Sequence, residues 1–137
     1  MRTYAGSCHC AAIGFDFRTA LAPAQWSIRA CQCAFCRAHA ALSCSDPDGT
    51  LAFVEHERGA LARYRFGLKT ADFLLCSRCG VYVGAVIDTP AGRFGIFNTR
   101  ALRDPPTDLP AAQPMVYDGE DAAARAARRT RRWTPLA

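Results

Sequence analysis

Seven of the eight cysteines in this 137-residue chain gather in three short clusters. The clusters are a C-x-C, a C-x-C-x-x-C and a C-x-x-C, formed by Cys8, Cys10, Cys31, Cys33, Cys36, Cys76 and Cys79. Thiolates at such short spacings converge on one soft cation, for which zinc is the usual choice. Because a zinc ion takes four ligands, seven cysteines divide into four and three. The count predicts two zinc ions per chain: one in a closed structural site, and one with an open position suited to catalysis.

The closed site is expected to combine the first and the last cluster. Cys76 and Cys79 lie in a C-S-R-C-G sequence, a zinc knuckle whose glycine tolerates the positive φ that such a turn often needs. Cys8 and Cys10 supply two more ligands, because residues i and i+2 of an extended segment project to the same face. His9 then points away from the ion. The four sulfurs would cross-link the start of the chain to its middle.

The middle cluster places Cys31, Cys33 and Cys36 within six residues. One short loop can wrap an ion with three ligands and leave the fourth direction clear. Two alternatives stay open from the residues alone. Either Cys44 or His39 closes this site, or the loop pairs with the C-x-x-C cluster and leaves the C-x-C without a role. We expect the open site, with its three cysteines as the catalytic residues, and Cys44 as a small buried apolar side chain.

The composition is that of one globular domain inside the cell. Half of the residues are hydrophobic, which supports a single domain over residues 1–137. We find no apolar run of about 18 residues and no secretory signal, so we expect a cytoplasmic protein with reduced cysteines and no membrane partner. The formal net charge of +5 falls once thiolates and metal ions are counted, so it is weak evidence for a polyanionic partner. No Ser-His-Asp arrangement, phosphate-binding loop or carboxylate pair is evident.

The hydrophobic pattern predicts a mainly β chain with one helix near its C-terminal end. Strands are expected at 13–17, 26–30, 41–45, 51–54, 64–66, 73–75, 81–87 and 93–97. The third and fourth of these flank an Asp-Pro-Asp-Gly turn and are expected to form a hairpin. The last two flank residues 88–92 and are expected to form another.

The last third of the chain combines a loop with the helix. Four prolines between 105 and 114 predict an irregular segment, and Asp118 is expected to cap a helix from about 119 to 133. Five arginines gather near the helix end, namely Arg125, Arg128, Arg129, Arg131 and Arg132. They would suit a nucleic-acid-binding module, but a solvated helix end that complements the helix dipole is the simpler interpretation.

The three cysteine motifs resemble those of the glutathione-dependent formaldehyde-activating enzyme family, also called the GFA or CENP-V/GFA domain family. The similarity rests on G-S-C-H-C at 6–10, C-Q-C-A-F-C-R at 31–37 and C-S-R-C-G at 76–80, in this order and at these separations. It covers roughly residues 4–103, which we take as the core of the domain. The resemblance implies an Mss4-like (β-tent) zinc-binding fold.

The resemblance also implies ligands and an activity. It assigns a structural zinc to Cys8, Cys10, Cys76 and Cys79, and a second zinc to Cys31, Cys33 and Cys36. The implied activity is that of a carbon–sulfur lyase similar to S-(hydroxymethyl)glutathione synthase, which adds a thiol to an aldehyde and catalyses the reverse. Glutathione or its aldehyde adduct is the expected partner. The chain departs from the family at Ala11, where glycine is usual, and at Ala40 and Ala41, in a segment that often holds glycine.

Four further residues are candidates for substrate contacts. They are Phe35, Arg37, His39 and Asn98. The first three lie in or just after the middle cluster, and the fourth follows a predicted strand. Two other functions stay open from the sequence: a non-catalytic zinc-binding module that binds nucleic acid or protein, and a scaffold in which both sites are closed. We do not expect a nucleic-acid partner.

Overall fold

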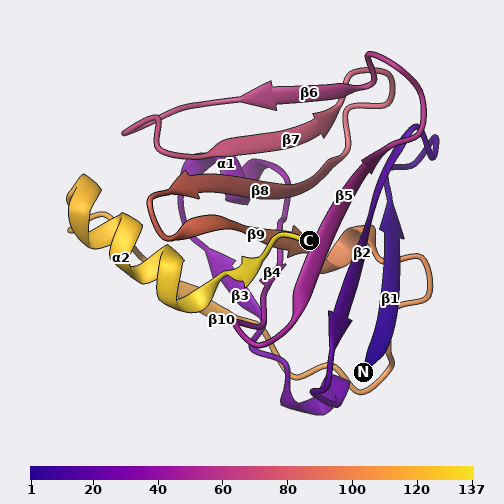
Figure 1. Ribbon diagram of the computed structural model, residues 1–137, viewed down its shortest axis with the longest axis horizontal. Helices are drawn as coiled ribbons and strands as arrows, with labels where there is room; N and C mark the ends of the chain where they lie inside the picture. Colours follow the sequence, from indigo (N-terminus) through magenta and orange to yellow (C-terminus); the bar gives the residue numbers. More distant parts are fainter.

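Two β-sheets of unequal size form the framework of the chain in the computed structural model, which describes residues 1–137 (Figure 1). The smaller sheet has the order β1-β2-β5, with β1 at Arg2–Ser7, β2 at Ile13–Thr19 and β5 at Thr50–Glu55. The larger sheet has the order β10-β3-β4-β9-β8-β7-β6, and β11 pairs with β9. Its strands are β3 (Arg29–Cys31), β4 (Ser43–Cys44), β6 (Leu61–Tyr64), β7 (Asp72–Cys76), β8 (Tyr82–Thr89), β9 (Gly92–Asn98), β10 (Gln113–Met115) and β11 (Thr134–Pro135).

The helices are few and short. α1 covers Ala34–Ala38 and α2 covers Ala122–Arg132, while two 3-10 turns lie at Pro23–Gln25 and Thr99–Ala101. Figure 1 shows α2 on the outer side of the larger sheet, near β8, β9 and β10. The prediction of a mainly β chain with a helix near the C-terminal end is thus confirmed. Neither helix has the length and apolarity that a membrane crossing requires.

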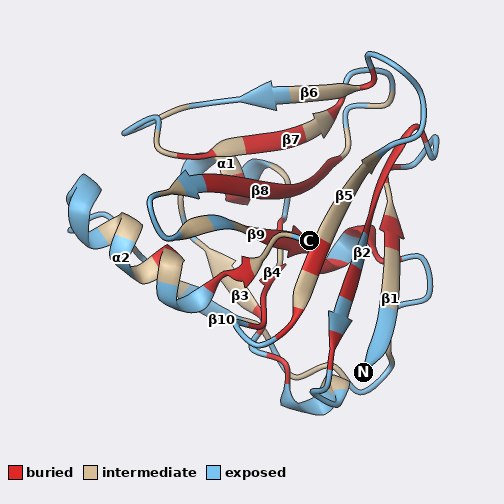
Figure 2. Cartoon of the chain, in the orientation of Figure 1, coloured by how far each residue is buried: buried red, intermediate tan, exposed pale blue.

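Aromatic side chains fill the space between the two sheets. The ring of Phe17 on β2 lies 4.5 Å from that of Phe97 on β9 and 5.4 Å from that of Trp26, while Phe15 lies 5.1 Å from Phe97. Figure 2 shows the buried stretches of β2, β8 and β9 that enclose this core. Gly6 on β1 is required here, because a Cβ at this position would lie 2.1 Å from Cζ of Phe15. The glycine of the G-S-C-H-C motif therefore makes room for the core beneath the first cysteine pair.

The expected hairpin over 41–54 is wrong, whereas the hairpin over 81–97 is confirmed. β8 and β9 pair in antiparallel register with Thr89 opposite Gly92, but β4 pairs with β3 and β9 while β5 joins β2 in the other sheet. The cause lies in the turn between β4 and β5. The Thr19 hydroxyl donates to the buried Asp46 carboxylate at 2.5 Å, and the Asp46 N–H donates to the Thr134 hydroxyl at 2.8 Å. The turn is therefore bonded to other segments, and the chain passes from one sheet to the other.

Three boundaries also differ from expectation. The strand expected at 26–30 begins at Arg29, after a 3-10 turn. Helix α2 is capped by Asp121, not Asp118, because its carboxylate accepts the N–H of Ala124 at 2.8 Å. The proline-rich loop contains strand β10, which pairs in parallel with β3. This pairing brings the segment before α2 to the strand that carries the middle cysteine cluster.

Candidate metal centres and the adjoining cavity

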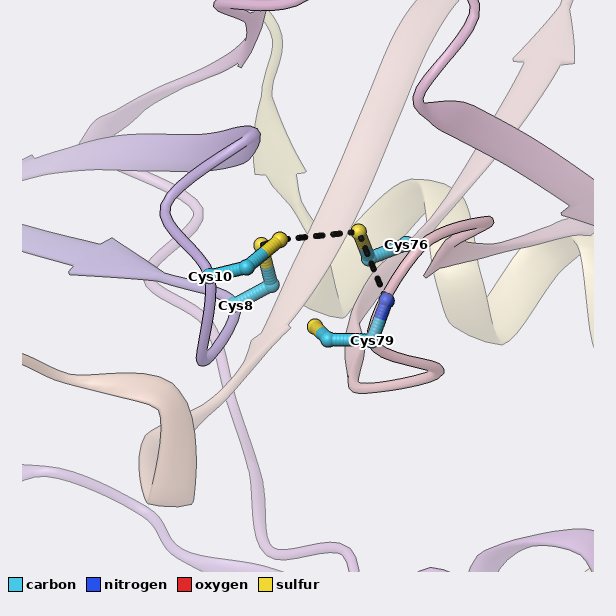
Figure 3. A group of neighbouring side chains, drawn as sticks. All are labelled: Cys8, Cys10, Cys76 and Cys79. Atoms are coloured by element: carbon cyan, nitrogen blue, oxygen red, sulfur yellow. Dashed lines mark hydrogen bonds between the residues drawn. The ribbon is translucent and has the colours of Figure 1, made fainter.

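Four cysteines from two distant turns converge on one point. Cys8 and Cys10 lie between β1 and β2, Cys76 ends β7 and Cys79 lies in the turn that follows it; Figure 3 shows the two turns facing each other. Their sulfur atoms all lie within 4.8 Å of one another, with Cys8 to Cys10 at 3.8 Å and Cys10 to Cys76 at 3.6 Å. Tetrahedral zinc with Zn–S bonds of about 2.3 Å places its sulfurs about 3.8 Å apart. The set fits a zinc ion, and the spacing is too wide for a disulfide, in which the sulfurs are about 2.05 Å apart.

Backbone N–H groups point at the sulfur atoms of this site. The N–H groups of Arg78 and Cys79 each lie 3.4 Å from the Cys76 sulfur, and the N–H of Ile13 lies 3.4 Å from that of Cys8. Gly80 has a φ of +79°, as expected for the turn of a zinc knuckle. N–H donors stabilise a thiolate over a thiol. The geometry is thus that of a closed site for a soft divalent ion.

The middle cluster forms a second group, made of three thiols. Cys31 ends β3, Cys33 precedes α1 and Cys36 lies in it, and their sulfurs lie within 4.8 Å of one another. A hydrogen bond from the Cys36 thiol lowers the pKa of Cys31 to about 5, while the same bond and burial raise the pKa of Cys36. The three-thiol group therefore carries negative charge on a sulfur that accepts a hydrogen bond from a neighbouring thiol. A divalent cation can take the place of these thiol protons. The prediction that the seven cysteines gather in two groups, of four and three residues, each able to hold a metal ion, is confirmed.

Neither of the two side chains considered as a fourth ligand belongs to this group. Cys44 lies in the core at 1% exposure, where burial raises the pKa of its thiol to about 12. The His39 ring lies 4.6 Å from that of Phe35, at the end of α1. The three-thiol group accordingly has no fourth protein donor.

A cavity of about 120 Å³ adjoins the three thiols. All three cysteines line it, and the arginines in its wall are Arg29, Arg125, Arg128 and Arg129. The aromatic side chains in its wall are Phe66, Phe73, Tyr117 and Trp133. The site thus combines sulfur ligands, cationic side chains and apolar surface around one small volume.

The arginines of the wall fall into two pairs. Both members of the first pair share the Glu120 carboxylate, which accepts Arg128 Nε and Nη2 at 2.8 and 3.0 Å and lies 3.4 Å from Arg125 Nε, so that one negative charge meets two positive ones. Arg29 and Arg129 have no acidic partner within ion-pair distance. They donate instead to neutral hydroxyls, Arg29 to Ser45 at 2.7 Å and Arg129 to Thr70 at 2.8 Å.

The structure places none of the four predicted substrate contacts in the lining of this cavity. Phe35 packs in an aromatic cluster, with ring distances of 4.9 Å to Phe73 and 5.1 Å to Tyr82. Arg37 is exposed. The Asn98 amide is bonded to the backbone, since its oxygen accepts two backbone N–H groups at 3.2 Å and its nitrogen donates to the Tyr82 carbonyl at 3.0 Å. These side chains support the fold around the site.

Sequence reasoning missed the arginines of the cavity wall. Arg125, Arg128 and Arg129 turn toward the cavity, whereas Arg131 and Arg132 are exposed, as expected for a solvated helix end. A signal was present, because arginines three and four positions apart share one helix face. Nothing in the sequence indicated that this face packs beside the cysteine loop, a placement that depends on the β3–β10 pairing.

No protein-family model matches the chain, and no curated protein does. Among solved structures, the chain is similar to a Rhodobacter sphaeroides protein whose crystal structure was determined as a Northeast Structural Genomics target. The two share 27% sequence identity at a TM-score of 0.58, over 81% of this chain and 99% of that one. This similarity supports the fold and carries no activity with it.

Proposed function

We propose that this chain is a zinc-dependent carbon–sulfur lyase of the GFA type, with an Mss4-like fold, which acts on adducts of an aldehyde with glutathione or a similar thiol. The observation that carries the proposal is the contrast between the two cysteine groups. One has four sulfurs in a closed arrangement, whereas the other has three and adjoins a cavity. A site that lacks one protein ligand beside a cavity is what substrate binding at a metal requires.

The donor sets favour zinc at both groups. All seven donors are sulfur, which selects soft or borderline ions, and the sulfur spacing of the four-thiol group suits a tetrahedral ion of zinc's size. At the three-thiol group, Cys31, Cys33 and Cys36 would hold the ion at the cavity wall. The bound ion would supply an open position at which a substrate thiol is stabilised in its deprotonated form.

The residues around the three thiols supply binding and exclusion of water. Phe66, Phe73 and Trp133 give the cavity an apolar side, which lowers the local dielectric and strengthens charge interactions inside it. Thiol addition to an aldehyde needs little more than alignment of two reactants in such a site. We therefore assign the protein's main contribution to holding the thiol and the carbonyl together.

Metal analysis of the wild type and of variants at two cysteines tests the metal assignment. The reduced wild-type protein should bind two zinc ions per chain, Cys33→Ser should bind one and remain folded, and Cys44→Ala, the matched control outside both groups, should still bind two. One ion or none in the wild type would remove the basis of the proposal.

Exchange spectroscopy tests the reaction. The interconversion of glutathione and formaldehyde with S-(hydroxymethyl)glutathione can be followed by NMR with ¹³C-formaldehyde. The zinc-loaded wild type should accelerate the exchange, Cys44→Ala should retain the acceleration, and Cys33→Ser should lose it. A fully loaded protein that accelerates exchange with neither glutathione nor a smaller thiol would refute the lyase proposal.

A further inference from the structure

Two cations in the cavity wall lack a carboxylate partner. Arg129 is buried, at 8% exposure, and Arg29 is partly buried. Their neighbours Arg125 and Arg128 share the carboxylate of Glu120, but no carboxylate lies within ion-pair distance of Arg29 or Arg129. The two guanidinium groups therefore line the cavity without a carboxylate bonded to either; the anionic groups of the wall are the cysteine sulfurs and Asp118, which lies beyond ion-pair distance of both.

The surroundings of Arg129 leave part of its hydrogen-bonding capacity free. One nitrogen, Nη1, donates to the Thr70 hydroxyl, while Nε is buried and has no partner. Its guanidinium carbon lies 5.0 Å from the centre of the Trp133 ring, which orients the group without neutralising it. Burial, reinforced by Arg128, lowers the pKa of Arg129 to about 10, as expected for a desolvated cation. A buried charge with an unused donor is costly unless an anion completes it.

We propose that this cavity selects a small thiol, or its aldehyde adduct, that carries a carboxylate, and that Arg29 and Arg129 bind this carboxylate. The inference rests on the proposed function for the sulfur end of the ligand and adds the chemistry of its other end. The guanidinium fork of arginine matches the planar carboxylate, which it binds through two parallel hydrogen bonds. The thiols and the arginines line the same volume, so one molecule can reach both.

The size of the cavity limits the ligand. Pockets that bury drug-sized molecules start at about 300 Å³, and this cavity has about 120 Å³. The enclosed part of the ligand is therefore short, with the carboxylate a few bonds from the sulfur. A mercapto acid such as 3-mercaptopropionate has this form.

A purely electrostatic role for the arginines predicts a different behaviour. Four cationic side chains beside three thiolates would also balance the charge of a metal–thiolate centre. Loss of one arginine would then weaken zinc binding and leave the discrimination between ligands unchanged. If the arginines recognise a carboxylate, loss of one arginine leaves zinc binding unchanged and weakens the discrimination between ligands, so experiment can separate the two roles.

Calorimetric titration of the zinc-loaded protein makes the comparison. The ligands are 3-mercaptopropionate, its neutral isostere 3-mercaptopropionamide, and propionate, which lacks the thiol. In the wild type the acid should bind at least tenfold more tightly than the amide, as expected for a charge-assisted hydrogen bond. Arg129→Gln should bring this ratio close to one, and Arg131→Gln, an exposed arginine of the same helix, should leave it unchanged.

Two further measurements keep every outcome decisive. Zinc affinity is measured by competition with a chelator. If Arg129→Gln fails to fold, Arg129→Lys and Arg29→Gln replace it, and each should lower the ratio of the affinities for the acid and the amide. An acid-to-amide ratio near one in the wild type overturns the inference but leaves the lyase proposal standing, since both thiols still bind. A variant that changes zinc affinity at an unchanged ratio also overturns it. If propionate binds through Arg129 and the thiol acid binds no better, thiol binding fails while carboxylate recognition holds.

Discussion

Replacing Ala11 by glycine should stabilise the protein, although the change removes a methyl group. Ala11 follows the first cysteine pair and has a φ of +65°, in the left-handed region. A residue with a Cβ pays about 1–2 kcal/mol for this conformation. Glycine avoids that cost but loses about 0.5–1 kcal/mol more conformational entropy on folding than alanine. The difference leaves a net gain of about 0.5–1 kcal/mol.

This gain is measurable in a domain of this length. With an unfolding entropy of about 2.1 cal/mol/K per residue, the melting temperature of the 137-residue chain should rise by roughly 2–4 °C. Scanning calorimetry at fixed zinc concentration gives this shift. The matched control is Ala127→Gly, the same chemical change at an exposed position within α2, which should cost about 1 kcal/mol and lower the melting temperature.

The direction of the change in melting temperature shows whether the backbone is strained at Ala11. Ala40, with a φ of +48° after α1, should behave like Ala11 when it is replaced by glycine. If Ala11→Gly lowers the melting temperature as much as the helical control does, the turn is not strained at this position and the reasoning from φ is wrong.

Three further predictions address the metal groups, an ion pair and a close contact. Cys76→Ser and Cys33→Ser should each lose one zinc ion by metal analysis, but only Cys76→Ser should lose several kcal/mol of stability, because its group joins two sheets. Hydrogen bonding from Arg128 lowers the pKa of Glu120 below its usual 4.5, so the carboxylate stabilises the fold above that pH and the contribution is lost as the pH falls. Glu120→Gln should therefore cost about 0.5–1 kcal/mol in urea titrations at pH 7, and its difference from the wild type should shrink as the pH falls below 4.5 and through the lowered pKa. Gly6→Ala should cost about 1–3 kcal/mol in the same titrations, because its new methyl group would overlap the ring beneath it.

The cysteine groups could be predicted because their chemistry depends on short-range spacing. Cys8 and Cys10 lie two positions apart in one turn and Cys76 and Cys79 three positions apart at another, so each pair can chelate one ion, and the balance of four and three follows from the coordination number of the ion. The β8–β9 hairpin could be predicted for the same reason, since its turn residues are local. In each case the information lies within a few neighbouring positions.

The arginines and the second hairpin depend on packing, which local patterns do not contain. Asp46 has the residue type of a hairpin turn, but its bonds to Thr19 and Thr134 separate the strands on either side. Arg129 has the residue type of a solvated helix end, yet the docking of α2 buries it beside the cavity. Such placements follow from contacts between segments far apart in the chain.

The separation of the cysteine pairs sets the order in which the two groups are completed during translation. Cys10 and Cys76 are 66 residues apart. At about 5–20 residues per second, a ribosome needs roughly 3–13 s to add them. Cys31, Cys33 and Cys36 leave the exit tunnel nearly together, well before Cys76. The nascent chain can therefore take up an ion at the three-thiol group while the thiols of Cys8 and Cys10 still lack their partners and stay open to oxidation.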